Sequence, residues 1–391
     1  MPKVMPRSAI ELSVVLPCLD EERTVGACVA QAEAFFKQNR VRGEVIVADN
    51  GSLDHSVQIS RSLGARVVQI AEKGYGNALR GGFAAARGKF ILMADADQSY
   101  DLLHLMPFLQ KLRAGYDLVM GNRFQGGIKK GAMPWHHKYL GNPVLSFLGR
   151  LFFRSPARDF HCGIRAFTRE ALQKMDLQTG GMELASEIVI KASLLGMKVC
   201  EVPTTLSPDG RDRPPHLRSF RDGWRHLRFL LIYSPRWLFA YPGLALAICG
   251  LIFSIALSSG PLHLPLRLVD FHSFIVAGTL VVLGINILSF YAITRVYAFN
   301  AGLLPRPPEF YPLFRILNLE KGLALGLMLS LAGIVIILYA ARLSQAPGGF
   351  ESMGLGRSVR LVFSGSLALL LGAQTISTSF VLSMLGMNVR R

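Results

Sequence analysis

Two carboxylates follow a short apolar segment near residue 95. Residues 90–94 are all apolar, and Asp95-Ala96-Asp97 comes directly after them. In an open α/β sheet, ligands gather beyond the carboxyl ends of the strands. Carboxylate oxygens are ligands that Mg²⁺ and Mn²⁺ accept, and these cations bind the oxygens of a diphosphate. The pattern therefore predicts a divalent-metal site at Asp95 and Asp97, with a diphosphate beside it.

The segments that must position this pair alternate between strand and helix patterns. Short β-rich apolar runs predict strands over residues 11–16, 44–48, 65–70 and 90–94. Helices are expected between them over residues 22–38, 56–63 and 76–86. Such alternation is typical of a mostly parallel, Rossmann-like sheet that helices cover on both faces.

Two other predicted strands also end in acidic residues. The first runs into Pro17-Cys18-Leu19-Asp20-Glu21-Glu22, and the second ends in Asp49-Asn50-Gly51-Ser52. An acidic residue after a strand can accept hydrogen bonds from a ribose or a base edge. Taken singly, Asp20 is explained as well by a helix cap and Asp49 by a turn. Three acidic strand ends at one sheet edge favour a nucleotide site.

A glycine loop, Lys73-Gly74-Tyr75-Gly76, precedes the third predicted helix. Its glycines allow close approach of the backbone, and its lysine could reach a phosphate near the helix N-terminus. An ordinary helix-entry turn is the alternative. The loop therefore supports a phosphate site only together with the strand ends.

The C-terminal part of the chain has four long stretches that are nearly free of charge. They cover residues 237–259, 273–293, 322–341 and 361–385, and each is long enough for a helix to cross a membrane. Buried helices of a large soluble protein are the alternative. We expect a catalytic domain over residues 1–206, a linking segment over 207–236 and a transmembrane domain over 237–391.

The N-terminal residues lack the apolar core of a signal peptide, so we expect the first domain in the cytoplasm. Four spans then return residues 388–391 to the same side. The loop over 294–321 carries four basic residues and that over 260–272 carries only Arg267, which agrees with the positive-inside rule. Arg342, Arg357 and Arg360 in the last outer loop oppose it.

The linking segment is rich in arginine. Arg218, Arg221, Arg225 and Arg228 fall on one helical stripe, beside a stripe of Phe220, Trp224, Leu227 and Leu231. The pattern predicts a helix in the membrane interface, with a solvated charged helix as the alternative. Residues 139–153 are amphipathic too.

The chain has a net charge of +17, and many of its arginines lie close to the first apolar stretch. This placement indicates membrane lipids and phosphate-bearing ligands as partners, and no nucleic acid.

The cysteines, a histidine pair and a pair of glutamates could also do chemistry, but we expect structural or surface roles for them. The five cysteines form no Cys-x-x-Cys pair, so they predict neither disulfides nor a zinc site. His136 and His137 are adjacent and lack a third ligand, which favours surface positions at the mouth of the site. Glu183 and Glu187 fall on one helical face beside Lys191, where an i,i+4 ion pair is expected in place of a catalytic base.

Taken in order, these motifs resemble the nucleotide-sugar domain of family 2 glycosyltransferases. Gly121-Asn122-Arg123-Phe124 and Asp159-Phe160-His161-Cys162-Gly163-Ile164-Arg165 are similar to the branch of dolichyl-phosphate mannosyltransferase and bacterial polyprenyl-phosphate glycosyltransferases. The resemblance covers about residues 10–235. It implies a GT-A fold for the catalytic domain.

The resemblance also implies roles on the donor side of the site. Asp49 and the loop from Pro17 to Glu21 would hold the nucleoside, and Lys73 and Ala96 would belong to the donor site. Asp95 and Asp97 would place Mg²⁺ or Mn²⁺ on the diphosphate, with Gln98 nearby. Cys18-Leu19-Asp20 replaces the usual Thr-Tyr-Asn, so the base is left open between UDP and GDP. We expect Arg211 or Arg213 to close over the diphosphate; a cover loop without phosphate contact is the alternative.

On the acceptor side, the resemblance implies that Arg123 contacts the acceptor phosphate. Asp159 and Arg165 would shape the pocket, and Arg218 and Arg221 would lie at its membrane side. Asp97, Gln98 and Arg123 are the expected catalytic residues. A lipid phosphate is already ionised near neutral pH, so such an enzyme needs cations to position the nucleophile and no strong general base.

The sequence thus predicts inverting, metal-dependent transfer of a single hexose from a UDP- or GDP-sugar to a polyprenyl (undecaprenyl or dolichyl) phosphate at the cytoplasmic membrane face. A processive polysaccharide synthase is one alternative, although Tyr233 stands where its Gln-x-x-Arg-Trp motif requires glutamine. A non-catalytic membrane scaffold that binds sugar nucleotides is another. The four spans exceed what an anchor requires and are compatible with a homo-oligomer.

Overall fold

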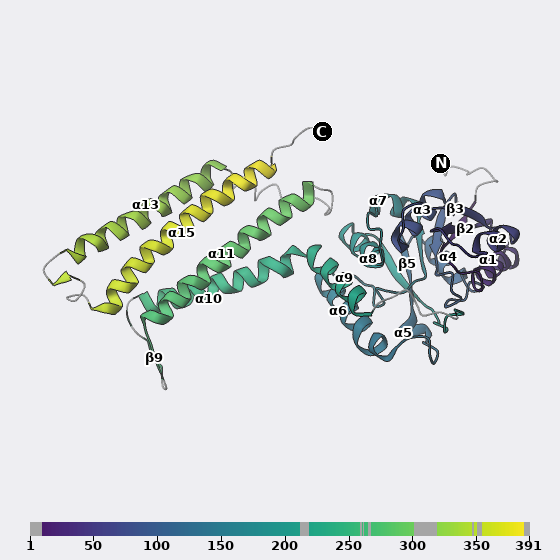
Figure 1. Cartoon of the computed structure of the whole chain (residues 1–391), viewed down its shortest axis with the longest axis horizontal. Coiled ribbons are helices and arrows are strands. Elements are labelled where there is room, and N and C mark those ends of the chain that lie inside the picture. The colour runs from purple at the N-terminus through teal and green to yellow at the C-terminus, as the bar shows by residue number, and fades with distance from the viewer. Residues whose placement is uncertain are drawn as a thin grey trace. The chain divides into compact units, whose positions relative to one another are not determined.

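The computed structural model describes residues 10–211, 219–258, 260, 262–264, 267–300, 319–345, 348–349 and 354–386. The chain forms two compact units, Met1–Leu230 and Leu231–Arg391. Figure 1 shows the first unit as a sheet with helices packed around it and the second as a set of long helices.

The first unit is built on a seven-stranded sheet in the order β3-β2-β1-β4-β6-β5-β7. Its strands are β1 (Leu12–Cys18), β2 (Gly43–Asp49), β3 (Arg66–Gln69), β4 (Phe90–Met93), β5 (Leu118–Asn122), β6 (Arg165–Thr168) and β7 (Val199–Pro203). Only β6 is antiparallel to its neighbours β4 and β5. The predicted strands are confirmed to within two residues, and the mostly parallel GT-A-like sheet is confirmed with them.

Helices cover both faces of the sheet because its strands are apolar on both sides. On one face lie α1 (Val25–Asn39), α2 (Ser56–Ser62) and α4 (Met106–Arg113); on the other lie α3 (Tyr75–Ala85), α7 (Arg169–Met175) and α8 (Leu184–Leu194). Alternate residues of β1 serve the two cores. Val14 and Leu16 pack in the core that contains α1 and α4, and Val15 packs in the core that contains α3 and α8.

The register of the sheet brings several strand ends to one edge. Val15 of β1 pairs with Met93 of β4, and Cys18 pairs with Asp49 of β2. Because β6 is antiparallel, it begins where β4 and β5 end: Arg165 pairs with both Met93 and Met120. The residues that follow β1, β2, β4 and β5 and those that precede β6 therefore lie at the same edge.

Three further helices complete the first unit near this edge. They are the short α5 (Arg123–Gly126), α6 (Asn142–Phe153), which the π-helix η1 (His137–Gly141) precedes, and α9 (Ser219–Ile232), whose last two residues belong to the second unit. The amphipathic pattern of residues 139–153 is confirmed in α6, since Val144, Phe147 and Leu151 are exposed along it.

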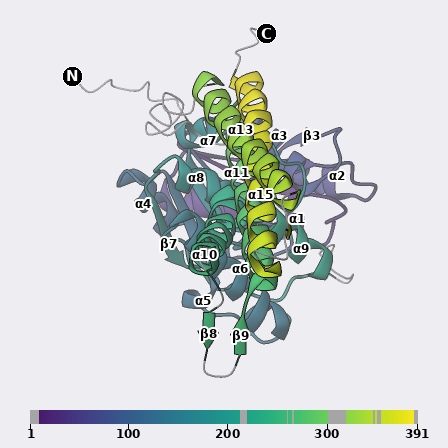
Figure 2. The ribbon, with the colours of Figure 1, turned by 90° about the vertical axis from the view of Figure 1, so that its left-hand side faces the viewer.

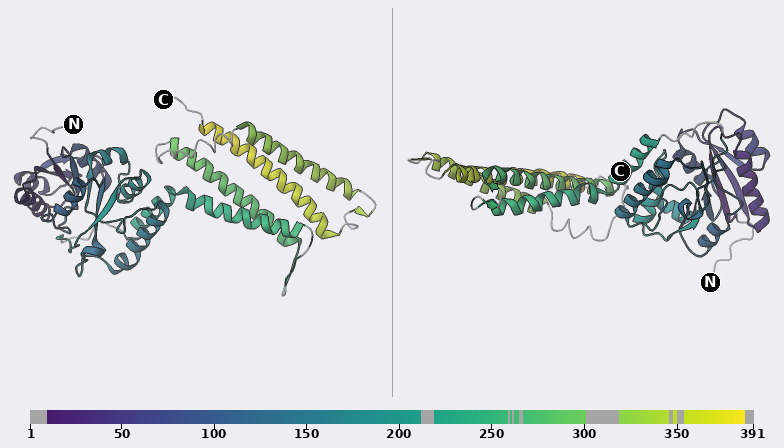
Figure 3. Two further views of the ribbon diagram at one scale, coloured as in Figure 1. Left: turned by 180° about the vertical axis from the view of Figure 1, so that it is seen from behind. Right: turned by 90° about the horizontal axis from the view of Figure 1, so that it is seen from below.

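Among its described residues, the second unit contains four helices that are long and apolar enough to cross a membrane. They are α10 (Tyr241–Ser258), which continues the π-helix η2 (Arg236–Ala240), α11 (Phe271–Asn300), α13 (Leu319–Ser344) and α15 (Leu355–Gly386). They confirm the prediction of four apolar helices, although α11, α13 and α15 are longer than the predicted stretches. In Figure 3, α10 runs beside α11 and α13 runs beside α15.

Small residues allow these membrane helices to approach closely. A Cβ added at Gly250 of α10 would stand 2.6 Å from the carbonyl oxygen of Ala277 in α11, and one at Gly333 of α13 would stand 2.6 Å from that of Gly365 in α15. A hairpin of β8 (Leu262–Leu264) and β9 (Arg267–Val269) lies between α10 and α11 in the sequence and projects to the side of these helices (Figure 2).

One of the arginines that opposes the positive-inside rule has an acidic partner. Arg360 of α15 is buried, and its guanidinium forms an ion pair with Asp270 at the start of α11. The pair ties the two helices together at this end. It also offsets the charge of one of the three arginines that oppose the positive-inside rule.

Candidate active site

Asp95 and Asp97 follow β4 and line one cavity of about 340 Å³. Asp97 is fixed by Ser99, whose backbone N–H donates to Asp97 Oδ1 over 3.0 Å and whose hydroxyl donates to the same oxygen. Asp95 accepts a 2.9 Å hydrogen bond from the Tyr75 hydroxyl on its Oδ1. Gly163 packs directly against the other oxygen of Asp95, because a Cβ added at Gly163 would stand 2.2 Å from Asp95 Oδ2.

The environment of Asp95 raises the free-energy cost of ionising its carboxyl group. Burial, followed by the nearby charge of Asp97, raises the pKa of Asp95 above its ordinary value, although the Tyr75 hydroxyl, Arg211 and Arg123 oppose the shift. A cation bound at this carboxylate would favour its ionised form. Binding of a divalent ion is therefore expected to release a proton from Asp95.

Arg211 connects the acid pair to the loop after β1. Its guanidinium lies 2.6 Å from Glu21 Oε1 and 3.2 Å from Asp97 Oδ2. Glu21 also accepts a hydrogen bond from the Thr24 hydroxyl over 2.9 Å. A second cavity of about 270 Å³ opens beside these residues, with Asp20, Glu22 and Asp54 in its wall. Asp97 Oδ2 thus already lies beside a cationic group, which fits a site for Mg²⁺ or Mn²⁺ at this pair.

The acids supply few protein ligands. Within the parts of the chain that the structure describes, no three His, Cys, Asp or Glu side chains gather closely enough to form a complete metal site. Asp95 and Asp97 would therefore share the ion with oxygens of a diphosphate and water, which is the usual arrangement for Mg²⁺.

The residues that are predicted to bind the nucleoside lie at the same edge of the sheet, and their polar groups form hydrogen bonds within the protein. The Asp49 carboxylate accepts hydrogen bonds from the backbone of Gly51 and Ser52 over 3.2 and 3.1 Å, so it closes its own turn. Lys73 donates to the Asn50 carbonyl over 2.7 Å. Pro17 lies within β1. Neither Asp49 nor Lys73 lines the two cavities.

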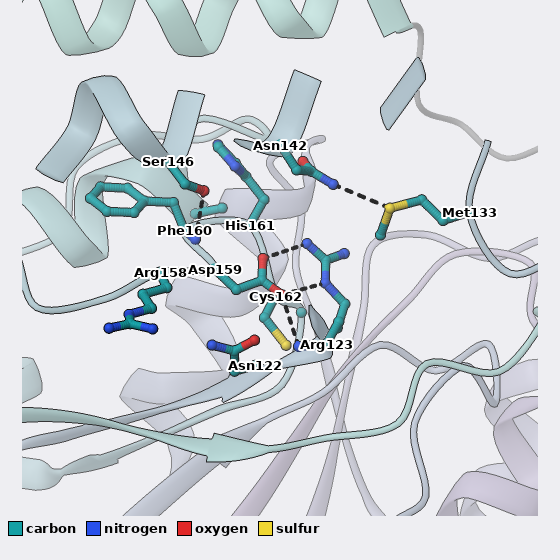
Figure 4. Close-up of polar contacts among 12 residues, drawn as sticks. Asn122, Arg123, Met133, Asn142, Ser146, Arg158, Asp159, Phe160, His161 and Cys162 are labelled. Atoms are coloured by element: carbon teal, nitrogen blue, oxygen red, sulfur yellow. Dashed lines mark hydrogen bonds and ion pairs between the residues drawn. The ribbon is translucent and has the colours of Figure 1, made fainter. Parts of the chain in front are cut away.

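Arg123 is held by a buried carboxylate at the end of β5 (Figure 4). Its Nε and Nη2 each donate to Asp159 over 2.7 Å, and its backbone N–H donates over 3.0 Å. Asp159 is fully buried, whereas Arg123 lines the 340 Å³ cavity. Within the described residues, nothing accepts a hydrogen bond from the remaining nitrogen, Nη1. Asp159 therefore orients Arg123 and leaves one end of its guanidinium for a ligand.

Arg165 holds backbone together. It is fully buried and donates to the carbonyl oxygens of Phe160, Cys162 and Ala185 over 2.7, 2.9 and 2.6 Å. These bonds fix the segment before β6 against α8. Arg165 thus shapes the wall of the cavity through the backbone that it organises.

The remaining predicted residues lie away from the cavity or outside the description. Gln98 adopts a left-handed backbone conformation, with φ of 63°, and its amide lies 3.5 Å from the Thr24 carbonyl. Arg221 is exposed on α9 and does not line the cavity. Arg213 and Arg218 lie outside the described residues.

Sequence reasoning missed several residues of the cavity wall. The sequence presents Tyr75 only as part of a glycine loop, yet its hydroxyl orients Asp95. His161 and His226 meet through Ser186: the Ser186 hydroxyl lies 2.9 Å from His226 Nδ1 and 3.4 Å from His161 Nε2. Burial, the nearby His226 and then Arg165 lower the pKa of His161, so it is neutral near pH 7. No sequence spacing signals these contacts, because their partners come from separate elements.

Comparison with known proteins gives two family matches. Residues 13–176 match the model of glycosyl transferase family 2, and residues 292–386 match the family 2 C-terminal transmembrane region. The low-salt glycan biosynthesis hexosyltransferase Agl6 of Haloferax volcanii is 34% identical over 378 residues, which cover 96% of this chain and 89% of that protein.

A second relative and a solved structure match the N-terminal part. A dolichyl-phosphate hexose transferase of Haloferax volcanii is 31% identical over 195 residues, covering 49% of this chain and 81% of that protein. Glucosyl-3-phosphoglycerate synthase of Mycobacterium tuberculosis, solved with Mn²⁺ and UDP, is 22% identical with a TM-score of 0.43, covering 57% of this chain and 78% of that one. The latter likeness is too low to bear on ligands.

Proposed function

This chain belongs to glycosyltransferase family 2, and we propose that it transfers one hexose from a nucleoside-diphosphate sugar to a polyprenyl phosphate with inversion at the sugar. The observation that carries the proposal is the shared cavity: the paired acids Asp95 and Asp97 and the oriented Arg123 line the same 340 Å³ space. A site for a cation and a site for an anion thus face one reaction space. The similarity to a dolichyl-phosphate hexose transferase supports this choice of acceptor.

On the donor side, Asp95 and Asp97 would hold Mg²⁺ or Mn²⁺ against the diphosphate. The ion supplies charge that stabilises the leaving nucleoside diphosphate. Tyr75 and Ser99 fix the two carboxylates before the ligand arrives, which lowers the cost of organising the site. Arg211, which contacts Asp97, is placed to add a second positive charge to the diphosphate.

On the acceptor side, Arg123 would bind the phosphate through its Nη1 nitrogen. Asp159 holds the guanidinium in one orientation, so little side-chain freedom is lost when the phosphate binds. The phosphate oxygen is an anion near neutral pH and attacks without a strong base. Attack on the face opposite the diphosphate gives the inverted product.

The exposed apolar surface of the first unit supports an acceptor in the membrane. Leu140, Val144, Phe147 and Leu151 are each more than 40% exposed and recur at helical spacing along η1 and α6. Trp224 of α9 is 59% exposed. We assign these side chains to the lipid interface, with the catalytic domain on the cytoplasmic side. The four apolar helices then make the chain a multi-pass membrane protein.

A donor screen tests the proposal. The purified full chain in liposomes that contain a polyprenyl phosphate is given Mn²⁺ and one UDP- or GDP-hexose at a time, and the lipid is analysed by mass spectrometry. We expect a lipid that carries one hexose with at least one donor. A product that carries a polymer indicates a processive synthase. Donor binding with unmodified lipid for every donor indicates a scaffold, and either result overturns the proposal.

A further inference from the structure

Glu187 of α8 is a buried carboxylate that the proposed reaction does not use. It is fully buried, and Lys191 lies 2.8 Å from its Oε1, as the i,i+4 spacing predicts. Its two oxygens also accept hydrogen bonds from the backbone of Gln178 and Thr179, each over 2.9 Å, and from the Thr179 hydroxyl over 2.6 Å. Burial opposes its charge, but the bonds from Lys191 and Thr179 hold the pKa of Glu187 below its ordinary value.

The loop that Glu187 fixes packs against the glycine loop of α3. The backbone N–H of Asn77 donates to the Gly180 carbonyl over 3.2 Å. A Cβ added at Gly74 would stand 2.3 Å from the Gly180 oxygen, and one at Gly76 would stand 2.5 Å from the Thr179 oxygen. Only glycine leaves room for this contact. The position of residues 179–180 therefore sets the position of the backbone on both sides of Tyr75.

Tyr75 passes this position on to the acid pair. It is the first residue of α3, and its hydroxyl donates to Asp95 Oδ1 over 2.9 Å. A displacement of its backbone would lengthen or break that bond. The contacts thus run without a gap from Glu187 through residues 179–180 and the glycine loop to Tyr75 and Asp95.

We propose that Glu187 is a positioning residue for the metal site, acting through the loop of residues 178–181 and Tyr75 on the carboxylate of Asp95. The inference rests on the proposed function only in taking Asp95 as a metal ligand. Glu187 lies in α8 and would act on the reaction only through these contacts.

Glu187→Gln and Glu183→Gln form a matched pair of variants. Glutamine at position 187 keeps the size of the side chain, but only its amide oxygen can accept hydrogen bonds. The loop therefore loses either the bond from Gln178 or those from Thr179. Glu183 lies one turn earlier on the same segment, and its buried Oε2 has no hydrogen-bond partner in the described part of the chain. Glu183→Gln therefore makes the same substitution without removing a hydrogen bond from the loop.

The measurement is the affinity of the full-length protein for Mn²⁺ in the presence of UDP or GDP, followed by the electron paramagnetic resonance signal of free Mn²⁺. Removal of an outer partner of a metal ligand typically weakens binding about 10- to 100-fold, so we expect a loss of about tenfold for Glu187→Gln and for Tyr75→Phe. Glu183→Gln should change the affinity less than about twofold. Thr179→Val, which removes only one hydroxyl, gives a smaller loss and serves if Glu187→Gln fails to fold.

A double-mutant cycle separates positioning from a general structural effect. If Glu187 acts through Tyr75, the double variant loses about tenfold, as either single variant does, and not about a hundredfold. A loss of Mn²⁺ affinity in the double variant that equals the product of the two single losses would overturn the inference. So would equal losses of affinity in Glu183→Gln and Glu187→Gln, or an unchanged affinity in both Glu187→Gln and Thr179→Val. Failure of the proposed function is a separate result: wild-type protein would then bind Mn²⁺ with nucleotide but leave polyprenyl phosphate unmodified.

Discussion

Removal of the Asp159 carboxylate should unfold the first unit at a lower temperature and also abolish transfer. Asp159 is fully buried and accepts three hydrogen bonds from Arg123, which is itself 7% exposed. Loss of one partner of a buried pair leaves an uncompensated charge and costs about 3–5 kcal/mol. At about 2–4 °C per kcal/mol for a unit of this size, a loss of ~3 kcal/mol lowers the Tm by about 6–12 °C.

Thermal unfolding of full-length Asp159→Ala in detergent, followed by tryptophan fluorescence, gives the shift. Glu11→Ala is the matched control, because Glu11 makes a two-pronged ion pair with Arg113 at a more exposed position. Such surface pairs contribute about 0–1 kcal/mol, so its Tm should stay close to wild type.

The double variant Asp159→Leu with Arg123→Met separates the structural effect from the chemistry. Apolar replacement of both partners of a buried pair is often neutral for stability. The backbone N–H of Arg123 would still lack an acceptor, at a cost of ~1 kcal/mol, so most of the Tm should return. Transfer should not return, because the acceptor phosphate has lost Arg123. A Tm of Asp159→Ala equal to that of Glu11→Ala, or an active double variant, would refute the reasoning.

Three further perturbations address the donor site and the membrane surface. Because the pKa of Asp95 is raised, protons compete with the cation as the pH falls from neutral, so Mn²⁺ affinity should decrease with falling pH; a flat titration between pH 8 and 5 would contradict the paired-acid site. Arg211→Ala removes a positive charge from beside Asp97, so Mn²⁺ alone should bind more tightly. The nucleotide sugar should bind about tenfold more weakly, as measured by calorimetry. Equal changes in the affinity for Mn²⁺ and for the nucleotide sugar would rule out a contact between Arg211 and the diphosphate. The double variant Val144→Glu with Phe147→Glu should reduce transfer to polyprenyl phosphate in liposomes and leave Mn²⁺–nucleotide binding unchanged. Leu53→Glu, at a 96% exposed position outside α6, should reduce neither transfer nor binding. Equal transfer by the double variant and by Leu53→Glu would show that α6 does not lie at the lipid interface.

The acid pair was predictable from sequence because its signal is local. An apolar strand and the two acids after it occupy eight consecutive residues, and the register of parallel strands then dictates which strand ends meet. The ion pair of Glu187 and Lys191 was predictable for the same reason, since i,i+4 spacing on a helix is enough to bring the side chains together. The four apolar helices followed from length and composition.

The contacts that complete the site were not predictable because they join distant segments. Arg123 and Asp159 are 36 residues apart, and Tyr75 and Asp95 are 20 apart, with no periodic pattern to link them. The antiparallel insertion of β6 between β4 and β5 places Arg165 beside both strands, which a pattern of alternating strands and helices does not reveal. Sequence thus indicated which residues carry charge at the edge, and the structure showed which of them hold one another.

The most direct test compares wild-type protein with Asp97→Ala in the same liposomes, with polyprenyl phosphate, the donor found by the screen and a titration of Mn²⁺. Asp97 lines the cavity with Arg123, and its removal leaves Ser99 and Arg211 without their shared acceptor. We expect wild-type protein to form the hexosylated lipid only when Mn²⁺ or Mg²⁺ is present. Asp97→Ala should form none, while its Tm stays near that of wild type. Equal product formation by the folded variant, or by wild-type protein after chelation of all divalent ions, would contradict this expectation.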